Sequence, residues 1–349
     1  MVMNINAEKR NDPRIADASV AAVVCTFASE RFELLVAAIA SLHQQDLPPE
    51  EIIVVVDHNP ALLERARREL RSRLPAGGDG GPRLILTANA HARGLSGGRN
   101  TALEITTCAF VAFLDDDAEA DATWLLTLRS GFRTPQVVGV GGRVEPVWEG
   151  ERRPPWFPPE MDWVVGCTYR GVPSETSVVR NPFGGAMMVR RQAVQAAGGY
   201  SERLGRTGTY PSGGEETELC IRMRQRDPDI VLIFEPATCI YHQVPRQRMS
   251  LRYLLHRCYA EGRSKAVVRR LTRAQGALAT ERSYALRTLP AGVVEGVAAL
   301  RHGDVDAVRR AGVIVVGLTA AVAGFAAQIL RSANDARGVR RQATAGGGR

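Results

Sequence analysis

Cysteine is scarce and unpatterned in this chain of 349 residues. The six cysteines lie far apart and include no CxxC pair, which excludes a zinc ribbon and a thioredoxin-type redox motif. Cys25, Cys220 and Cys239 lie inside apolar segments. This placement is typical of buried thiols in a reducing compartment.

Other missing patterns narrow the classes of function. The chain has no Walker loop and no GxGxxG loop, which argues against ATP hydrolysis and dinucleotide binding. It has no Ser–His or Cys–His arrangement for nucleophilic catalysis, and no helix-turn-helix, zinc or aromatic RNA-binding signature. The first residues are polar and lack the apolar core of a secretory signal, so we expect residues 1–17 to be disordered and the protein not to be secreted.

Positive charge is concentrated in one segment. The net charge is +8, and from Arg246 to Arg287 eleven Lys and Arg stand against two acids, a local balance of +9. Such a segment binds an anionic membrane surface, a phosphorylated lipid or nucleic acid. Because no nucleic-acid signature accompanies the charge, we expect an anionic membrane surface and no nucleic-acid partner.

The first 130 residues alternate between strand and helix patterns. Apolar runs at Val20–Cys25, Ile52–Val56, Arg83–Leu86 and Ala109–Leu114 predict strands, and the stretches between them predict helices. This alternation predicts an α/β fold with a mixed, mainly parallel sheet flanked by helices. In such sheets ligands bind at the carboxyl ends of the strands.

Polar residues follow three of the predicted strands. Thr26 follows the first, Asp57 the second, and the fourth is followed by Asp115, Asp116 and Asp117. Three adjacent carboxylates repel one another, but a hard cation such as Mg²⁺ or Mn²⁺ that holds a diphosphate would turn this repulsion into binding. An acidic turn that caps the next helix is the alternative interpretation.

The segment Gly94–Asn100 (GLSGGRN) has the composition of a phosphate-binding turn. Its glycines allow close approach of the backbone, and the following helix N-terminus offers free N–H groups. Arg99 adds a guanidinium group, which can donate two parallel hydrogen bonds to a phosphate.

A second acidic motif opens a predicted helix at Glu215 and Glu216. Glu216 shares a helical stripe with Cys220 and Met223, so we expect it to face inwards. A partly buried carboxylate costs free energy unless it is paired or used. Glu216 is therefore our candidate general base.

Together these motifs resemble the family 2 glycosyltransferases, which have the GT-A fold. The similarity covers about residues 18 to 252, roughly two thirds of the chain. Each motif alone is weak, and it is their order and spacing that make the resemblance specific. The motifs are the Thr26–Arg31 opening, Asp57, GLSGGRN, FLDDDA, PFGGAMMVRR with GGYSERL, and GGEETELCIR.

The resemblance implies an inverting transfer of a hexose or hexuronic acid from a nucleotide-diphospho-sugar, usually a UDP-sugar, with Mg²⁺ or Mn²⁺. It implies metal ligands at Asp115, Asp117 and His242. It implies a catalytic pair at Glu215 and Glu216, with Glu216 as the base where the family usually has Asp. It also implies donor binding at nine positions: Thr26, Phe27, Arg31, Asp57, Arg99, Asp115, Asp116, Gly184 and Gly185.

The last third of the chain is predicted to be helical. We expect a catalytic domain over residues 18–250, a basic helical extension over 251–310 and an apolar helix over 311–330 that contains no charge. Twenty residues meet the length needed to span a membrane, but the many Ala and Gly leave a buried core helix as the alternative. We expect residues 331–349 to be a disordered tail.

The finer resemblance of PFGGAMMVRR, YHQVPRQR and RCYAEGRSK is to relatives that extend polyprenyl-phosphate-linked sugars, including glucuronosyltransferases of that type. It implies a lipid-linked or cell-envelope glycan acceptor and a catalytic domain on the cytoplasmic face of the cell membrane. The alternatives are a soluble glycosyltransferase acting on a small metabolite and a non-catalytic nucleotide-sugar-binding protein. Trp156, Phe157 and Trp163 either line an acceptor site or pack against the fold.

Overall fold

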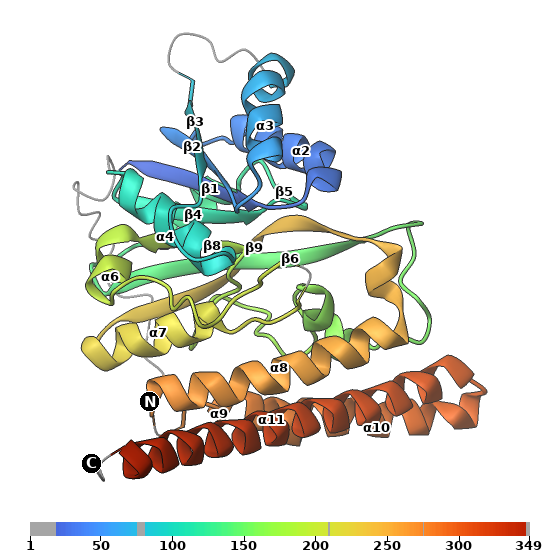
Figure 1. Ribbon diagram of the computed structural model, residues 1–349. Coiled ribbons are helices and arrows are strands. Elements are labelled where there is room, and N and C mark those ends of the chain that lie inside the picture. Colours follow the sequence, from blue (N-terminus) through green and yellow to red (C-terminus); the bar gives the residue numbers. More distant parts are fainter. Residues whose placement is uncertain (1–18, 75–80, 209, 275, 347–349) are drawn as a thin grey trace. The chain divides into compact units, whose positions relative to one another are not determined.

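The computed structural model describes residues 19–74, 81–208, 210–274 and 276–346 (Figure 1). The disordered N-terminus predicted over residues 1–17, and the last three residues of the predicted tail, lie outside the described residues. The chain folds as two compact units. The first comprises Met1–Val147, Val172–Glu202 and Leu219–Gln243, and the second comprises Trp148–Gly171, Arg203–Glu218 and Val244–Arg349.

A mixed sheet forms the frame of the first unit. Its strands are β1 (Val20–Thr26), β2 (Glu51–Val56), β3 (Arg83–Ala88), β4 (Phe110–Asp115), β5 (Ala118–Ala120), β6 (Val137–Trp148), β7 (Ser177–Val178), β8 (Ala186–Arg190) and β9 (Val231–Val244). They run in the order β3-β2-β1-β4-β8-β6-β9-β5, with β7 paired to β9. The four strands expected from apolar runs are β1 to β4, and they pair in parallel. Antiparallel pairs continue the sheet from β4 onwards.

Helices cover both faces of the parallel part of the sheet (Figure 1). Helices α2 (Phe32–His43) and α3 (Pro60–Arg73) lie on one face and α4 (Leu95–Ile105) on the other. Helix α3 begins where Asn59 accepts a hydrogen bond from the Leu62 amide. The remaining helices that contribute to this unit are η1 (Ser29–Arg31), α5 (Trp124–Ser130), α6 (Arg191–Ala196) and most of α7 (Glu215–Arg226).

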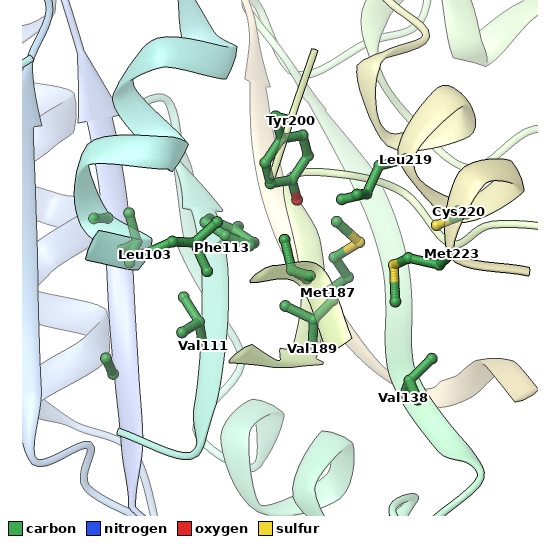
Figure 2. Packing of buried hydrophobic residues seen from close by; sticks show 14 of the residues in the cluster. Leu103, Val111, Phe113, Val138, Met187, Val189, Tyr200, Leu219, Cys220 and Met223 are labelled. Atoms are coloured by element: carbon green, nitrogen blue, oxygen red, sulfur yellow. The ribbon is translucent and has the colours of Figure 1, made fainter. Parts of the chain in front are cut away.

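The core of the first unit joins the sheet to helices α4 and α7 (Figure 2). Phe113 on β4 meets Tyr200 edge-on, with ring centroids 5.7 Å apart. Cys220 and Met223 of α7 are buried in the same cluster, as their helical stripe predicts. All six cysteines are free thiols.

The second unit is mainly helical. Its elements are η2 (Pro159–Val165), η3 (Arg246–Met249), α8 (Leu251–Thr272), α9 (Ala279–Ser283), η4 (Tyr284–Thr288), α10 (Leu289–Ala298), η5 (Ala299–His302) and α11 (Val305–Gly346). Helix α8 starts where the Ser250 hydroxyl accepts a hydrogen bond from the Tyr253 amide. Helix α11 continues to Gly346, beyond Leu330, where we expected the apolar helix to end.

Helix α11 is long and apolar enough over Val305–Ala333 to cross a membrane. Only 22% of its most apolar window is buried, whereas the core helix of a soluble protein is mostly buried. This low burial favours membrane attachment of α11 over a core helix.

The aromatic residues of the Pro-rich segment pack within the second unit. Phe157 is fully buried, and its ring lies 5.3 Å from Trp148 and 5.5 Å from Trp156. Trp163 donates a hydrogen bond from Nε1 to the Tyr284 hydroxyl at 2.8 Å. These contacts favour packing over an acceptor-binding role for Phe157 and Trp163.

Candidate active site

Polar residues gather at the carboxyl edge of the parallel strands because of the strand register. In the register Cys25 pairs with Asp115 on one side, and Thr26 pairs with Val56 on the other. The residues that follow these positions, Asp57 after β2 and Asp116 after β4, therefore lie beside the end of β1. The predicted meeting of the three strand tips is correct.

Asp116 is buried and is bound by residues about 90 positions earlier in the chain. The Thr26 hydroxyl donates to Asp116 Oδ2 at 2.7 Å, and Arg31 Nη1 donates to Asp116 Oδ1 at 2.8 Å. Burial raises the pKa of Asp116 to about 6, the charge of Asp117 adds to the rise, and Arg31 and Thr26 oppose it. Arg31 Nη1 also lies 3.1 Å from Asp117 Oδ2, so its one charge is shared between two carboxylates.

Asp115, Asp117 and His242 form a cluster suited to a divalent cation. Each offers one ligand atom, and these atoms lie within 4.8 Å of one another. Strand pairing brings His242 there, because β9 runs antiparallel to β5 with His242 opposite Ala118. His242 Nε2 lies 3.1 Å from Asp117 Oδ1. Two carboxylates and one imidazole suit Mn²⁺ or Mg²⁺, so the residues fit the metal that the sequence predicts.

Gly185 leaves the space that the Asp115 carboxylate occupies. A Cβ on Gly185 would lie 2.3 Å from Asp115 Oδ2, closer than any real contact. Gly184 beside it has its carbonyl oxygen bound by Arg99 Nη2 at 3.0 Å. The two glycines thus form the wall next to the acidic cluster.

Arg99 is 2% exposed, and its guanidinium lies among apolar rings and backbone. It stands 5.3 Å from the ring centroids of both Phe113 and Tyr200. With its bond to the Gly184 carbonyl, Arg99 is placed to fix the glycine wall. Its assignment as a diphosphate-binding residue stays a prediction.

Asp57 is fixed by a partner that the motif analysis missed. Asn89 Nδ2 donates to Asp57 Oδ1 at 2.7 Å, and the Gly94 amide donates to Asp57 Oδ2 at 3.0 Å. Asn89 is buried at the end of β3, and its own Oδ1 accepts from the Thr101 hydroxyl and the His91 amide. The sequence feature that could have identified Asn89 is its position directly after the third predicted strand, since polar residues that follow the other three strands were candidates.

Phe27 is half-buried beside the carboxyl edge of the parallel strands. Its carbonyl oxygen accepts from Asn59 Nδ2 at 2.9 Å, and the Arg31 guanidinium lies 5.7 Å from its ring centroid. The side chain therefore borders the groups that bind Asp116.

Glu215 and Glu216 belong to the second unit and open helix α7. Glu215 is buried and Glu216 is half-buried. The loop before them rests on α8, where the Gly213 amide donates to Ser264 Oγ at 3.3 Å. Gly214 has φ +89°, a conformation that favours glycine, and a Cβ there would lie 3.2 Å from Val268.

Comparison with known proteins decides the family. The family model described as Glycosyl transferase family 2 matches residues 21–198, which is half of the chain. The chain belongs to glycosyltransferase family 2. It is an enzyme of the glycosyltransferase class, and the match covers every strand tip described above.

Two curated proteins are similar to this glycosyltransferase over most of their length. A glucosyl-dolichyl phosphate glucuronosyltransferase of Haloferax volcanii is 32% identical over 250 residues, covering 71% of this chain and 77% of the relative. The succinoglycan biosynthesis protein ExoM of Rhizobium meliloti is 27% identical over 268 residues, covering 76% of each.

A solved structure confirms the fold class. The mannosyltransferase PcManGT from Pyrobaculum calidifontis, in complex with GDP-Man and Mn²⁺, superposes with a TM-score of 0.52 at 15% identity and covers 86% of both chains. The glycosyltransferase therefore has the predicted GT-A fold.

Proposed function

We propose that this enzyme transfers a hexose or hexuronic acid, with inversion, from a UDP-sugar to a hydroxyl of a lipid-linked or cell-envelope glycan. The part of this proposal that concerns the sugar donor rests on the cluster of Asp115, Asp117 and His242 beside the strand ends of a family 2 glycosyltransferase. A bound Mg²⁺ or Mn²⁺ would there neutralise the negative charge of the leaving diphosphate.

The fixed carboxylate of Asp57 supports nucleotide binding. Each of its oxygens accepts one protein hydrogen bond, and an ionised carboxylate has about four acceptor positions. Asp57 can therefore still accept from the imide of a uracil base. Thr26, Phe27 and Arg31 border the same edge, and in our proposal they line the donor site with Asp116.

In this proposal Glu216 is the general base that activates the acceptor. Glu216 removes the proton from the acceptor hydroxyl as its oxygen bonds to the anomeric carbon and the bond to the diphosphate breaks. A single displacement on the face opposite the leaving group inverts the configuration. The first turn of α7 supports the assignment, because its free N–H groups favour an ionised carboxylate.

The acceptor class and location are inferred from the relatives and from α11. The Haloferax relative is named for a glucosyl-dolichyl phosphate substrate, and the Rhizobium relative for biosynthesis of a polysaccharide. A lipid-linked acceptor lies at a membrane, and α11 is apolar enough to bind one. We propose that the catalytic domain acts on the cytoplasmic face of the cell membrane.

The test is an assay of the purified protein with Mn²⁺ and separate donors, UDP-glucuronic acid, UDP-glucose and GDP-mannose. The acceptor is a polyprenyl-phosphate-linked monosaccharide in detergent. We expect a UDP-sugar to give an extended lipid with inverted configuration. Transfer only to small water-soluble acceptors would replace the lipid acceptor, and donor binding without any transfer would favour a non-catalytic protein.

The matched variants are Glu216→Gln and Glu119→Gln, the second altering an exposed carboxylate on β5. Loss of a general base lowers turnover by roughly 10²- to 10⁴-fold, so we expect that loss for Glu216→Gln and none for Glu119→Gln. UDP binding should be retained in both. Unchanged turnover in Glu216→Gln would remove the base assignment.

A further inference from the structure

Helix α11 exposes an apolar stripe along its length. Its exposed positions between residues 312 and 330 recur every three or four residues, and none of them carries a charge. A helix whose outer face meets water normally has polar residues there. The stripe consists of Gly312, Val315, Val316, Thr319, Val322, Ala323, Ala326, Ile329 and Leu330.

The opposite face of α11 is bound closely to α8 (Figure 1). A Cβ on Gly262 would lie 1.9 Å from the Ala321 carbonyl oxygen, and one on Gly324 would lie 2.0 Å from the Tyr259 carbonyl oxygen. Ala321 and Gly324 are one turn apart, and at 100° per residue they lie on the side of the helix away from Val322 and Ala326. Glycines therefore bring the two backbones into contact, while the stripe faces outwards.

Polar bonds also join the two helices. Arg263 donates from Nε to Gln328 at 3.1 Å, and Arg270 donates from Nη1 to the Ser332 hydroxyl at 3.3 Å. If α11 crossed a bilayer with α8 attached, these arginines would enter hydrocarbon, which is costly. If it crossed alone, the glycine contacts of Gly262 and Gly324 would be lost.

Helix α10 adds a second apolar surface beside that of α11. Gly296 of α10 packs against α11, where a Cβ would lie 2.6 Å from the Ala307 carbonyl oxygen. Val294 and Val297 are 67% and 57% exposed, and Leu286 before them is also exposed. The apolar surface of this unit is thus larger than one helix supplies.

Exposed arginines surround these helices. Arg287 and Arg301 flank α10, and Arg309 and Arg331 flank the stripe of α11. The acids of α10, of α11 and of the turn between them whose side chains the structure describes are bound to arginines: Glu295 to Arg170, Asp304 to Arg310 and Asp306 to Arg309. Among these described side chains the remaining charge is positive, which complements an anionic lipid surface.

We propose that α11 lies in the plane of an anionic membrane, with its exposed stripe in the upper acyl region, and does not cross the bilayer. An amphipathic helix of this kind inserts about 5–10 Å deep and stays parallel to the surface. The occupant of the apolar face is the lipid bilayer. The proposal builds on the lipid-linked acceptor, but its test measures binding and depth, so its failure leaves the transferase assignment untouched.

The first experiment is flotation of the full chain with vesicles of phosphatidylcholine alone or mixed with phosphatidylglycerol. We expect binding that is stronger with phosphatidylglycerol, and an approximately tenfold or greater loss of binding in Val322→Asp, because a carboxylate in the acyl region is disfavoured. Val178→Asp is the control, since Val178 is equally exposed on β7 of the first unit. Circular dichroism checks that all variants fold.

The second experiment measures depth with a fluorescent label on a cysteine introduced at Val315, Val322 or Ile329, quenched by lipids carrying bromine at known depths. A helix in the plane gives one depth for all three labels. A spanning helix gives depths that differ by about 1.5 Å per residue, or about 21 Å across these positions, and overturns the proposal. Absence of vesicle binding also overturns it, as does a dimer in solution that Val322→Asp dissociates.

Discussion

Gly185 is the residue at which the space for the acidic cluster is tightest. In Gly185→Ala the new methyl would meet Asp115 Oδ2 at 2.3 Å, so the carboxylate must move. Misplacement of a reacting group by about 1 Å costs on the order of a hundredfold in rate, and we expect a loss of that order in Mn²⁺-dependent turnover. The measurement is kcat/KM as a function of Mn²⁺ concentration.

Gly312→Ala is the control for Gly185→Ala, because its methyl would meet nothing within 4 Å. It should leave turnover and its dependence on Mn²⁺ unchanged. If Gly185→Ala behaves like Gly312→Ala, Asp115 is not a metal-binding residue.

Asn89 is predicted to act through Asp57. Asn89→Ala removes the donor to Asp57 Oδ1 and to the Ala92 carbonyl, and a lost bond to a charged group costs about 1.5–3 kcal/mol. We expect donor binding to weaken by at least about tenfold, with a smaller change in kcat. Asn89→Asp should weaken it further, because a second carboxylate faces Asp57. Titration with UDP measures both, and unchanged affinity contradicts the role.

At the residue scale the sequence predicted which residues lie together better than it predicted the contacts that they make. The family resemblance implied metal ligands at Asp115, Asp117 and His242, and the structure places these three residues together. Spacing did not reveal that Thr26 and Arg31 bind Asp116, or that Arg99 binds the Gly184 carbonyl. Those contacts depend on strand register and side-chain reach, which a single sequence does not contain.

At the scale of elements, opposite faces of α8 contact the proposed membrane-binding helix α11 and the loop before the proposed catalytic pair. Gly262 and Arg263 contact α11, while Ser264 and Val268 support Gly213 and Gly214, which precede Glu215. The half-buried carboxylate of Glu261 lies on the same side as Ser264 and binds Arg257 and Lys265. Burial alone would raise its pKa, but the charges of Lys265 and Arg257 outweigh burial and lower the pKa to about 2.

Glu261→Gln should therefore destabilise the protein in a pH-dependent way. A carboxyl with a lowered folded-state pKa contributes its stability above the unfolded pKa of 4.5 and loses it as the pH falls to about 2. We expect a loss of about 3 kcal/mol at pH 7, because each pKa unit corresponds to about 1.4 kcal/mol. The difference from the parent should shrink between pH 4.5 and pH 2.

Denaturant unfolding at several pH values measures this effect. Glu119→Gln, at an exposed site on β5, should cause little change at any pH. A loss in Glu261→Gln that is the same at pH 7 and pH 3 contradicts the charge explanation.

Elements with strong local patterns were predicted, and those defined by pairing were not. The runs that became β1, β2 and β4 are apolar and buried, and the run that became β3 is mainly half-buried. In contrast, β5 and β7 have three and two residues and exist through their pairing with β9. The loss of apolar residues after Leu330 predicts that the helix ends there and that residues 331–349 are a disordered tail, but in the structure α11 continues to Gly346. Many of the following residues are Ala and Arg, which favour helix.

At the scale of the whole molecule, the two units divide the proposed roles. Asp57, Asp115, Asp117 and His242 belong to the first unit, whereas Glu216 belongs to the second with α8 and α11. Donor binding, proton removal and membrane binding thus depend on different sets of residues. Variants should therefore separate the three properties.

This division predicts which variants a bound donor stabilises. A ligand at about 100 times its Kd adds about 2.7 kcal/mol to the folded state, which raises Tm by several degrees. With UDP and Mn²⁺ we expect this rise in the parent and in Glu216→Gln, and its loss in Asp117→Asn and after chelation of the metal. Calorimetry measures it, and Glu216→Gln is the matched control because it changes a carboxylate of the second unit. An undiminished rise in Asp117→Asn contradicts metal-linked donor binding at this cluster, since UDP would then bind without the carboxylate that His242 contacts.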